Sequence, residues 1–153
     1  KALDKLKKRD QLKLLIFGKN NNNHSFHKYN YESIGTIDDK ELLSKYYSSA
    51  DVFVAPSIEE NLANTVLESM SCGTPVVAFN VGGMTDIIDH KVNGYLADPY
   101  NADDLSNGIE WVLNHKDKTS LRLEARKKIK KVFSLENEMK SYYDLYLELN
   151  EKK

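Results

Sequence analysis

Short apolar runs alternate with helix-like segments along most of this chain. The runs are Leu12–Phe17, Tyr31–Ile34, Asp51–Ala55, Val76–Phe79 and Tyr95–Ala97. A run that is apolar throughout, such as Val76–Phe79, indicates a strand buried on both faces, as in parallel sheets covered by helices. Alternation at this length is typical of repeated βαβ units. We therefore expect an α/β domain with a Rossmann-like, doubly wound parallel sheet.

The segments between these runs carry helix signals. Asp39–Ser49 has leucines and tyrosines at helical spacing, and Asp38 or Asp39 can cap its start. Thr65–Cys72 ends at Gly73, as helices commonly do. Further helices are predicted from Gly83 through Ile88, from Ala102 onward, and over Thr119–Val132 and Leu135–Leu149.

The bulk composition excludes several classes of function. The 153 residues suit one domain over residues 1–153, and Lys plus Arg (22) nearly cancel Asp plus Glu (23). This balance gives no reason to expect nucleic acid as a partner. A single cysteine, Cys72, allows no internal disulfide, and no apolar stretch approaches the roughly 20 residues that span a bilayer. We expect a cytoplasmic protein.

Ligands of open α/β sheets bind beyond the carboxyl ends of the strands. Three features fall at such positions: Gly18, the segment Ser57–Asn64, and the Gly82-Gly83 pair. The middle one is the most informative, because Glu59 and Glu60 lie in a loop that leads directly into a helix.

The start of that helix can receive an anion. Its first N–H groups have no partner inside the helix and carry the positive end of the helix dipole. Leu62, Ala63, Asn64 and Thr65 would present these donors, and the small side chains of Ala63 and Asn64 would let a phosphate come close. Donors fixed in this way can stabilise a departing diphosphate.

Spacing alone also supports simpler interpretations. Thr65 and Glu68 fit a capping box worth about 1 kcal/mol, which spacing favours for Glu68. Glu59 and Glu60 could be solvated loop acids, and Asn64 could be an N-cap. The chain has no G-x-G-x-x-G, G-x-x-x-x-G-K, G-x-S-x-G or D-x-D motif. The residues thus predict an α/β domain with an anion or nucleotide site.

The run from Ala50 to Leu105 resembles the C-terminal domain of the GT-B glycosyltransferases of family 4, the glycosyl transferases group 1. The shared features are a strand, Pro-Ser, an E-x7-E pair, a helix, C-G-T-P-V-V and a Gly-Gly loop, in that order. A weaker resemblance runs from Leu12 to the C-terminus. It implies retaining transfer of a sugar from a nucleotide-diphosphate donor of UDP or GDP type, with no metal or other cofactor.

The resemblance also implies roles for individual residues. Glu60 is the first acid of E-x7-E and would be catalytic, facing the donor sugar, whereas Glu68 would bind the ribose hydroxyls. Ile37 would lie beside the base. The implied substrate-binding set is Gly18, Thr36, Ile37, Leu62, Ala63, Asn64, Thr65, Glu68 and Gly83. One departure concerns the common E-x-F-G, which here reads Glu60-Asn61-Leu62-Ala63.

The same resemblance implies that this chain is half of an enzyme. The first strand with its phosphate-binding cations and the N-terminal domain that binds the acceptor, a glycan or lipid-linked glycan, would both be absent. The fragment would be inactive alone, helix 135–149 would cross onto the missing domain, and membrane contact would occur only through that half, at the inner face. Alternatives are a catalytically silent nucleotide-sugar-binding module, a GT-B nucleotide-sugar epimerase domain and a purely structural domain.

Overall fold

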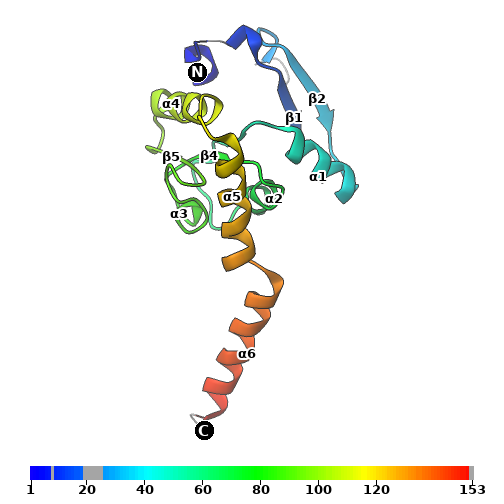
Figure 1. The fold of residues 1–153 in the computed structure, drawn as a ribbon, viewed down its shortest axis with the longest axis vertical. Helices are drawn as coiled ribbons and strands as arrows, with labels where there is room; N and C mark the ends of the chain where they lie inside the picture. The colour runs from blue at the N-terminus through cyan, green and yellow to red at the C-terminus, as the bar shows by residue number, and fades with distance from the viewer. Residues whose placement is uncertain (8, 19–25, 152–153) are drawn as a thin grey trace.

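The computed structural model describes residues 1–7, 9–18 and 26–151 of the chain. Within these residues the strands are β1 (Leu14–Phe17), β2 (Tyr31–Gly35), β3 (Phe53–Ala55), β4 (Val76–Phe79) and β5 (Gly94–Ala97). All paired strands run parallel, and helices separate most of them in sequence. The predicted α/β class with a parallel, helix-flanked sheet is therefore confirmed (Figure 1).

The helices are α1 (Lys40–Ser49), α2 (Asn64–Ser71), α3 (Met84–Ile87), α4 (Ala102–Leu113), α5 (Lys118–Val132) and α6 (Leu135–Glu151). Two short 3-10 turns, Leu3–Lys5 and Arg9–Gln11, precede β1. Asp39, and not Asp38, caps α1, because its carboxylate accepts from the N–H groups of Glu41 and Leu42. The predicted loop over residues 19–29 lies mostly outside the described residues.

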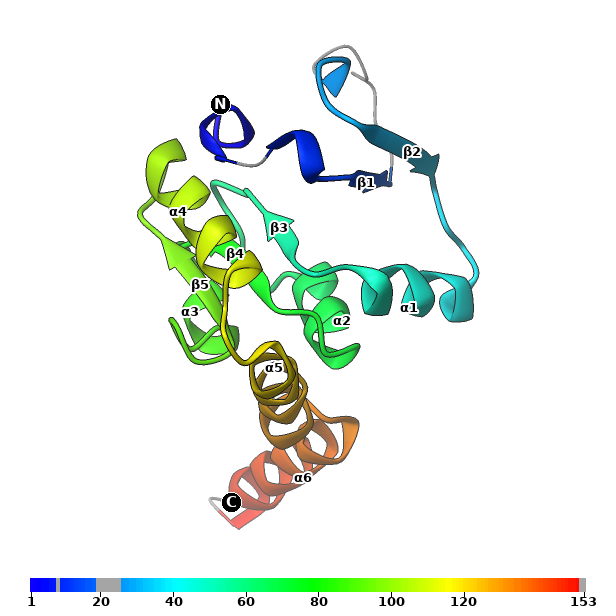
Figure 2. The same cartoon turned by 45° about the horizontal axis from the view of Figure 1, so that its top comes forward.

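The strands divide into two sheets, which the sequence did not predict. One has the order β1-β2 and the other β3-β4-β5, with no backbone pairing between β1 and β3 (Figure 2). The two sheets meet through side chains: the rings of Phe17 on β1 and Phe53 on β3 stack with centroids 6.2 Å apart. As edge strands, β1 and most of β3 are only half-buried, so the prediction of burial on both faces is wrong for them.

Strand β4 is fully buried and sets the layers of the core. Val76 and Ala78 belong to one apolar cluster, which includes residues of α2, α3 and α5. Val77 and Phe79 belong to a second cluster with residues of α4. Successive side chains of a strand point to opposite faces, so β4 contributes to both layers in turn. This sandwich fixes the carboxyl ends of β3 and β4 relative to the start of α2.

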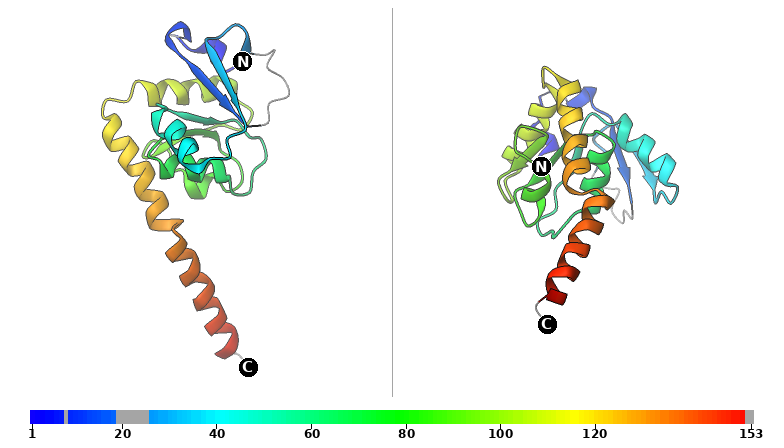
Figure 3. Two further views of the ribbon diagram at one scale, coloured as in Figure 1. Left: turned by 90° about the vertical axis from the view of Figure 1, so that its right-hand side faces the viewer. Right: turned by 60° about the horizontal axis from the view of Figure 1, so that its bottom comes forward.

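Helix α6 leaves the body of the domain. It continues roughly in the direction of α5, away from both sheets (Figures 1 and 3). None of its residues is buried, although it carries large apolar side chains. The exposed ones are Leu135, Met139, Tyr142, Tyr143, Leu145, Tyr146, Leu147 and Leu149. Helix α6 thus carries apolar and aromatic side chains that are not packed against this domain.

Candidate functional site

The ends of β1 and β2 bring three of the predicted residues together. The Gly18 N–H donates to the Gly35 carbonyl at 2.8 Å, so Thr36 and Ile37, which follow Gly35, lie close to Gly18. Thr36 is exposed and Ile37 half-buried. Gly18 adopts φ of 100°, a conformation that suits glycine, at the point where the chain leaves β1.

The loop with Glu60 lies directly against the Gly-Gly loop after β4. A Cβ atom added to Gly83 would stand 1.9 Å from the Asn61 carbonyl oxygen, far inside van der Waals contact. Only glycine permits this approach of two backbones. Glu60 itself is half-buried, and its carboxylate makes no hydrogen bond to any other residue that the structure describes. The carboxylate can therefore meet a ligand.

The start of α2 presents unpaired backbone donors. Ala63 is the N-cap and provides no side-chain acceptor. Within the described residues, the N–H groups of Asn64 and Thr65 have no acceptor. Ala63 is 6% exposed and Leu62 is 46% exposed, so the chain turns from surface to core at this point. An anion in front of α2 would meet free N–H groups at the positive end of the helix dipole.

The capping-box interpretation of Glu68 is wrong, and so is that of Asn64 as N-cap. The N-cap and third helical positions are Ala63 and Val66, not Thr65 and Glu68. Asn64 is instead the first residue of the helix. Glu68 lies in the second turn, where its Oε2 accepts a hydrogen bond from the Tyr47 hydroxyl at 3.1 Å. The carboxylate is exposed and directed toward α1, not toward the start of its own helix.

Tyr47 is a site residue that the sequence did not identify. It is 2% exposed, and its ring contacts those of Phe17 and Phe53 edge-on, with centroids 5.3 and 5.5 Å away. Burial, and next the nearby Glu68 carboxylate, raises the pKa of the Tyr47 hydroxyl. In the sequence Tyr47 was only an apolar position of a helix. One feature could have pointed to Tyr47: the hydroxyl of a tyrosine at an apolar, buried helix position needs a hydrogen-bond partner.

The structure thus groups the predicted residues along the carboxyl edge of the strands. One group is Gly18, Thr36 and Ile37. Another is Glu60, Leu62 and Gly83, joined by the contact of their loops. Phe17, which precedes Gly18, links the first group through Tyr47 to Glu68 on α2.

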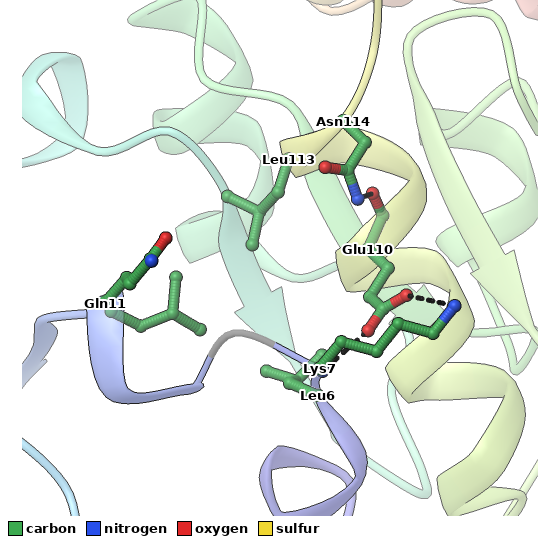
Figure 4. Close-up of a pocket in the computed structure, with 7 residues that line it drawn as sticks. Leu6, Lys7, Gln11, Glu110, Leu113 and Asn114 are labelled. Atoms are coloured by element: carbon green, nitrogen blue, oxygen red, sulfur yellow. Dashed lines mark hydrogen bonds and ion pairs between the residues drawn. The ribbon is translucent and has the colours of Figure 1, made fainter.

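A cavity of about 410 Å³ lies elsewhere, between α4 and the N-terminal segment. Leu6, Glu110 and Leu113 are among its lining residues, and Glu110 binds the Lys7 backbone N–H at 2.8 Å (Figure 4). Another lining residue, Leu12, precedes β1, which places the cavity toward the amino ends of the strands. No predicted site residue lines it. Its position is opposite to the edge where such sheets bind ligands.

Among the described residues, no group of three or more His, Cys, Asp and Glu side chains could hold a metal ion. No helix in the described part of the chain has both the length and the apolar character needed to cross a bilayer.

Comparison with known sequences gives matches to glycosyltransferases. The model of the family described as "Glycosyl transferases group 1" matches residues 1–132. An uncharacterized glycosyltransferase of Methanocaldococcus jannaschii is 46% identical over 74 residues, which are 48% of this chain and 19% of that protein. A D-inositol 3-phosphate glycosyltransferase of Pseudarthrobacter chlorophenolicus is 33% identical over 108 residues, covering 65% of this chain and 26% of its own length.

Solved structures show the same fold. A glycosyltransferase of Rickettsia africae superposes with a TM-score of 0.80 at 24% identity, covering 99% of this chain and 43% of its own. Sucrose-phosphate synthase of Thermosynechococcus elongatus gives 0.78 at 29% identity, over 92% of this chain and 39% of its own. Anabaena HepE, whose structure was solved in complex with UDP-glucose, superposes with a TM-score of 0.75 at 21% identity. The match covers 93% of this chain and 42% of HepE. This chain spans less than half the length of each of these proteins.

Proposed function

Since this chain belongs to the glycosyl transferases group 1 family, we propose that it is the C-terminal, donor-binding domain of a family 4 GT-B glycosyltransferase. Its ligand is a nucleotide-diphosphate sugar of UDP or GDP type. The glycosyl group passes with retention to a hydroxyl of an acceptor glycan or lipid-linked glycan. The observation that carries the proposal is the uncapped start of α2, where Asn64 and Thr65 present free N–H groups beside the Glu60 loop.

The diphosphate would lie in front of α2. As the bond between the anomeric carbon and the diphosphate breaks, negative charge grows on the departing oxygens. The N–H groups of Asn64 and Thr65 are fixed before the reaction, so they stabilise this charge without reorganisation. The small Ala63 keeps the approach open, and Leu62 and Gly83 shape the wall next to it. Gly18, Thr36 and Ile37 would border the base.

Glu60 is the proposed catalytic residue. A positive charge develops on the sugar ring as the leaving group departs, and a nearby carboxylate stabilises it electrostatically. Glu60 is half-buried and not engaged by other described residues, and its backbone is held by the glycines after β4. The acceptor hydroxyl forms the new bond to the anomeric carbon as the bond to the diphosphate breaks, and its proton passes to the departing diphosphate oxygen. The complete protein, with Glu60→Gln, would bind donor but lose turnover.

We propose that no metal cofactor takes part, because the chain lacks the D-x-D pair that chelates metal on a nucleotide diphosphate. The remaining partner is the N-terminal domain of the same protein, which would supply the acceptor site. The exposed face of α6 would pack on it, and contact with a membrane would pass through that domain. We propose a cytoplasmic location, where the single Cys72 would stay reduced.

Calorimetric titration of the chain with UDP and with GDP tests this proposal. One nucleotide should bind saturably with a Kd near the millimolar range, and Glu68→Ala should weaken it about tenfold through the loss of a charged hydrogen-bond acceptor. Glu59→Ala is the control, because Glu59 is an exposed acid in the loop before α2 and has no proposed role. Absence of saturable binding to either nucleotide would favour a purely structural domain and refute the donor-site assignment.

A further inference from the structure

We propose that Tyr47 is a positioning residue for Glu68: its buried hydroxyl holds one carboxylate oxygen so that the other is oriented for ribose hydroxyls before a nucleotide arrives. This inference rests on the proposed function, which assigns the ribose to Glu68. It adds a specific residue on another helix that determines how well Glu68 performs that role.

The geometry supports a tether with one fixed end. Tyr47 is buried, and its backbone carbonyl accepts a hydrogen bond from Thr74 Oγ1 at 2.6 Å. Arg122 on α5 donates to the carbonyl oxygens of Ser48 and Ala50, at 2.7 and 2.8 Å, and so anchors the end of α1. Rings of Phe17 and Phe53 contact the Tyr47 ring edge-on. The phenol therefore has little freedom of its own.

Glu68 is the exposed end of this tether. Its carboxylate is exposed, and Tyr47 is its hydrogen-bond donor among the described residues. An exposed glutamate without a partner samples several rotamers, and a ligand must then freeze them. The hydrogen bond from Tyr47 to Oε2 selects one arrangement in advance and leaves Oε1 for the ligand. Freezing a side chain of this kind changes an affinity by about three- to tenfold.

Ligands that differ only in the ribose separate this role from a structural one. UDP and 2′-deoxy-UDP, and the corresponding guanine pair, should be titrated against wild type, Tyr47→Phe and Tyr46→Phe. Tyr46 is the matched control, since it is the adjacent residue of α1 and forms no hydrogen bond through its hydroxyl to a described residue. Thermal melting of each variant monitors the fold.

The expected result is selective. Tyr47→Phe should weaken the ribonucleotide about three- to tenfold and the 2′-deoxynucleotide, which keeps only the 3′-hydroxyl for Glu68, by a clearly smaller factor, and it should add no loss in a Glu68→Ala background. Tyr46→Phe should bind both as wild type does. An equal loss for both sugars, or no loss, would overturn the role of Tyr47 while the donor-site proposal stands. If wild type binds no nucleotide, both proposals fail.

A second variant tests the proposal if the Tyr47→Phe protein does not fold. Glu68→Asp shortens an exposed side chain, so the fold should survive, and it draws the carboxylate away from the Tyr47 hydroxyl while the charge is kept. The same selective loss of the ribonucleotide is expected. Ribonucleotide binding that matches wild type in Glu68→Asp would contradict the positioning role.

Discussion

A Cβ atom on Gly82 would stand 1.7 Å from the carbonyl oxygen of Glu60. Gly82 also adopts φ of 49°, so a side chain there meets both a clash and a strained backbone. The position of the proposed catalytic loop therefore depends on a glycine that follows a different strand. A sequence motif describes each loop by itself. In the structure the Gly82-Gly83 loop and the Glu60 loop are in direct contact, so the position of one depends on the other.

Replacing Gly82 by alanine should displace the Glu60 loop. We expect nucleotide affinity to fall at least tenfold, because the loop leads directly into the N–H groups of Asn64 and Thr65. Gly73→Ala is the matched control: Gly73 also has a positive φ, of 76°, but its nearest atom would be 3.5 Å away. Backbone strain should cost each variant about 1 kcal/mol of unfolding free energy, and Gly82→Ala should lose more because of the clash with the Glu60 carbonyl. Equal affinities in the two variants would contradict the coupling of the loops.

Arg122 should be important for stability. Its guanidinium joins α5 to the last carbonyls of α1 through two hydrogen bonds. Arg122→Ala should reduce the free energy of unfolding by about 1.5–3 kcal/mol, as expected for hydrogen bonds from a charged group. Urea denaturation measures this, with Arg126→Ala as control, because Arg126 is exposed on the same helix. A loss as small as that of the control would show that α1 does not depend on this anchor.

Tyr95 should make the free energy of unfolding depend on pH in the alkaline range. Burial, followed by the hydrogen bond to Asp104, raises the pKa of Tyr95 from 10.0 to about 12. The folded state favours the neutral phenol. The contribution of Tyr95 to the free energy of unfolding is therefore complete below pH 10 and is lost as the pH rises toward 12. Relative to Tyr95→Phe, wild type should lose about 1–2 kcal/mol over this window.

Urea denaturation of both proteins at several pH values between 9 and 12 measures the difference, in which the lysine titrations cancel. Tyr100→Phe is the control, since Tyr100 is 69% exposed. A parallel pH dependence in wild type and Tyr95→Phe would show that the phenol does not titrate differently on folding.

Removal of α6 should leave the domain folded. No residue of α6 is buried, so a chain ending at residue 134 should unfold within about 0.5 kcal/mol of the full chain. For comparison, Ile129→Ala on α5, where Ile129 is 6% exposed, should lose about 2–4 kcal/mol. A large destabilisation on truncation would mean that α6 packs on this domain in solution.

Much of the fold could be predicted from residue patterns. Val76–Phe79 was predicted at the observed boundaries, and α2 to within one residue, because apolar runs and glycine stops are local signals. The division into two sheets was not predictable from such signals. Pairing between strands is a tertiary property, and the runs of β1 and β3 do not encode which neighbour each strand pairs with.

The local structure of the candidate site was predictable only where its signals are local. The free start of α2 follows from the loop-to-helix transition, which the sequence displays. The capping-box interpretation of Glu68 was wrong, because T-x-x-E forms a capping box only if Thr65 is the N-cap, and the helix already begins at Asn64. The partner of Glu68, Tyr47, comes from a helix 21 residues upstream. No local spacing rule connects these two residues.

The central claim places the nucleotide at the carboxyl edge of the strands, over the start of α2. Amide chemical shifts of the labelled chain, followed during titration with UDP and with GDP, test this directly. We predict that the largest saturable shifts fall on the amides of Asn64, Thr65, Gly18 and Gly83, with the residues around Leu6 and Glu110 unchanged. Shifts confined to the cavity beside Glu110, or no saturable shifts with either nucleotide, would contradict the account.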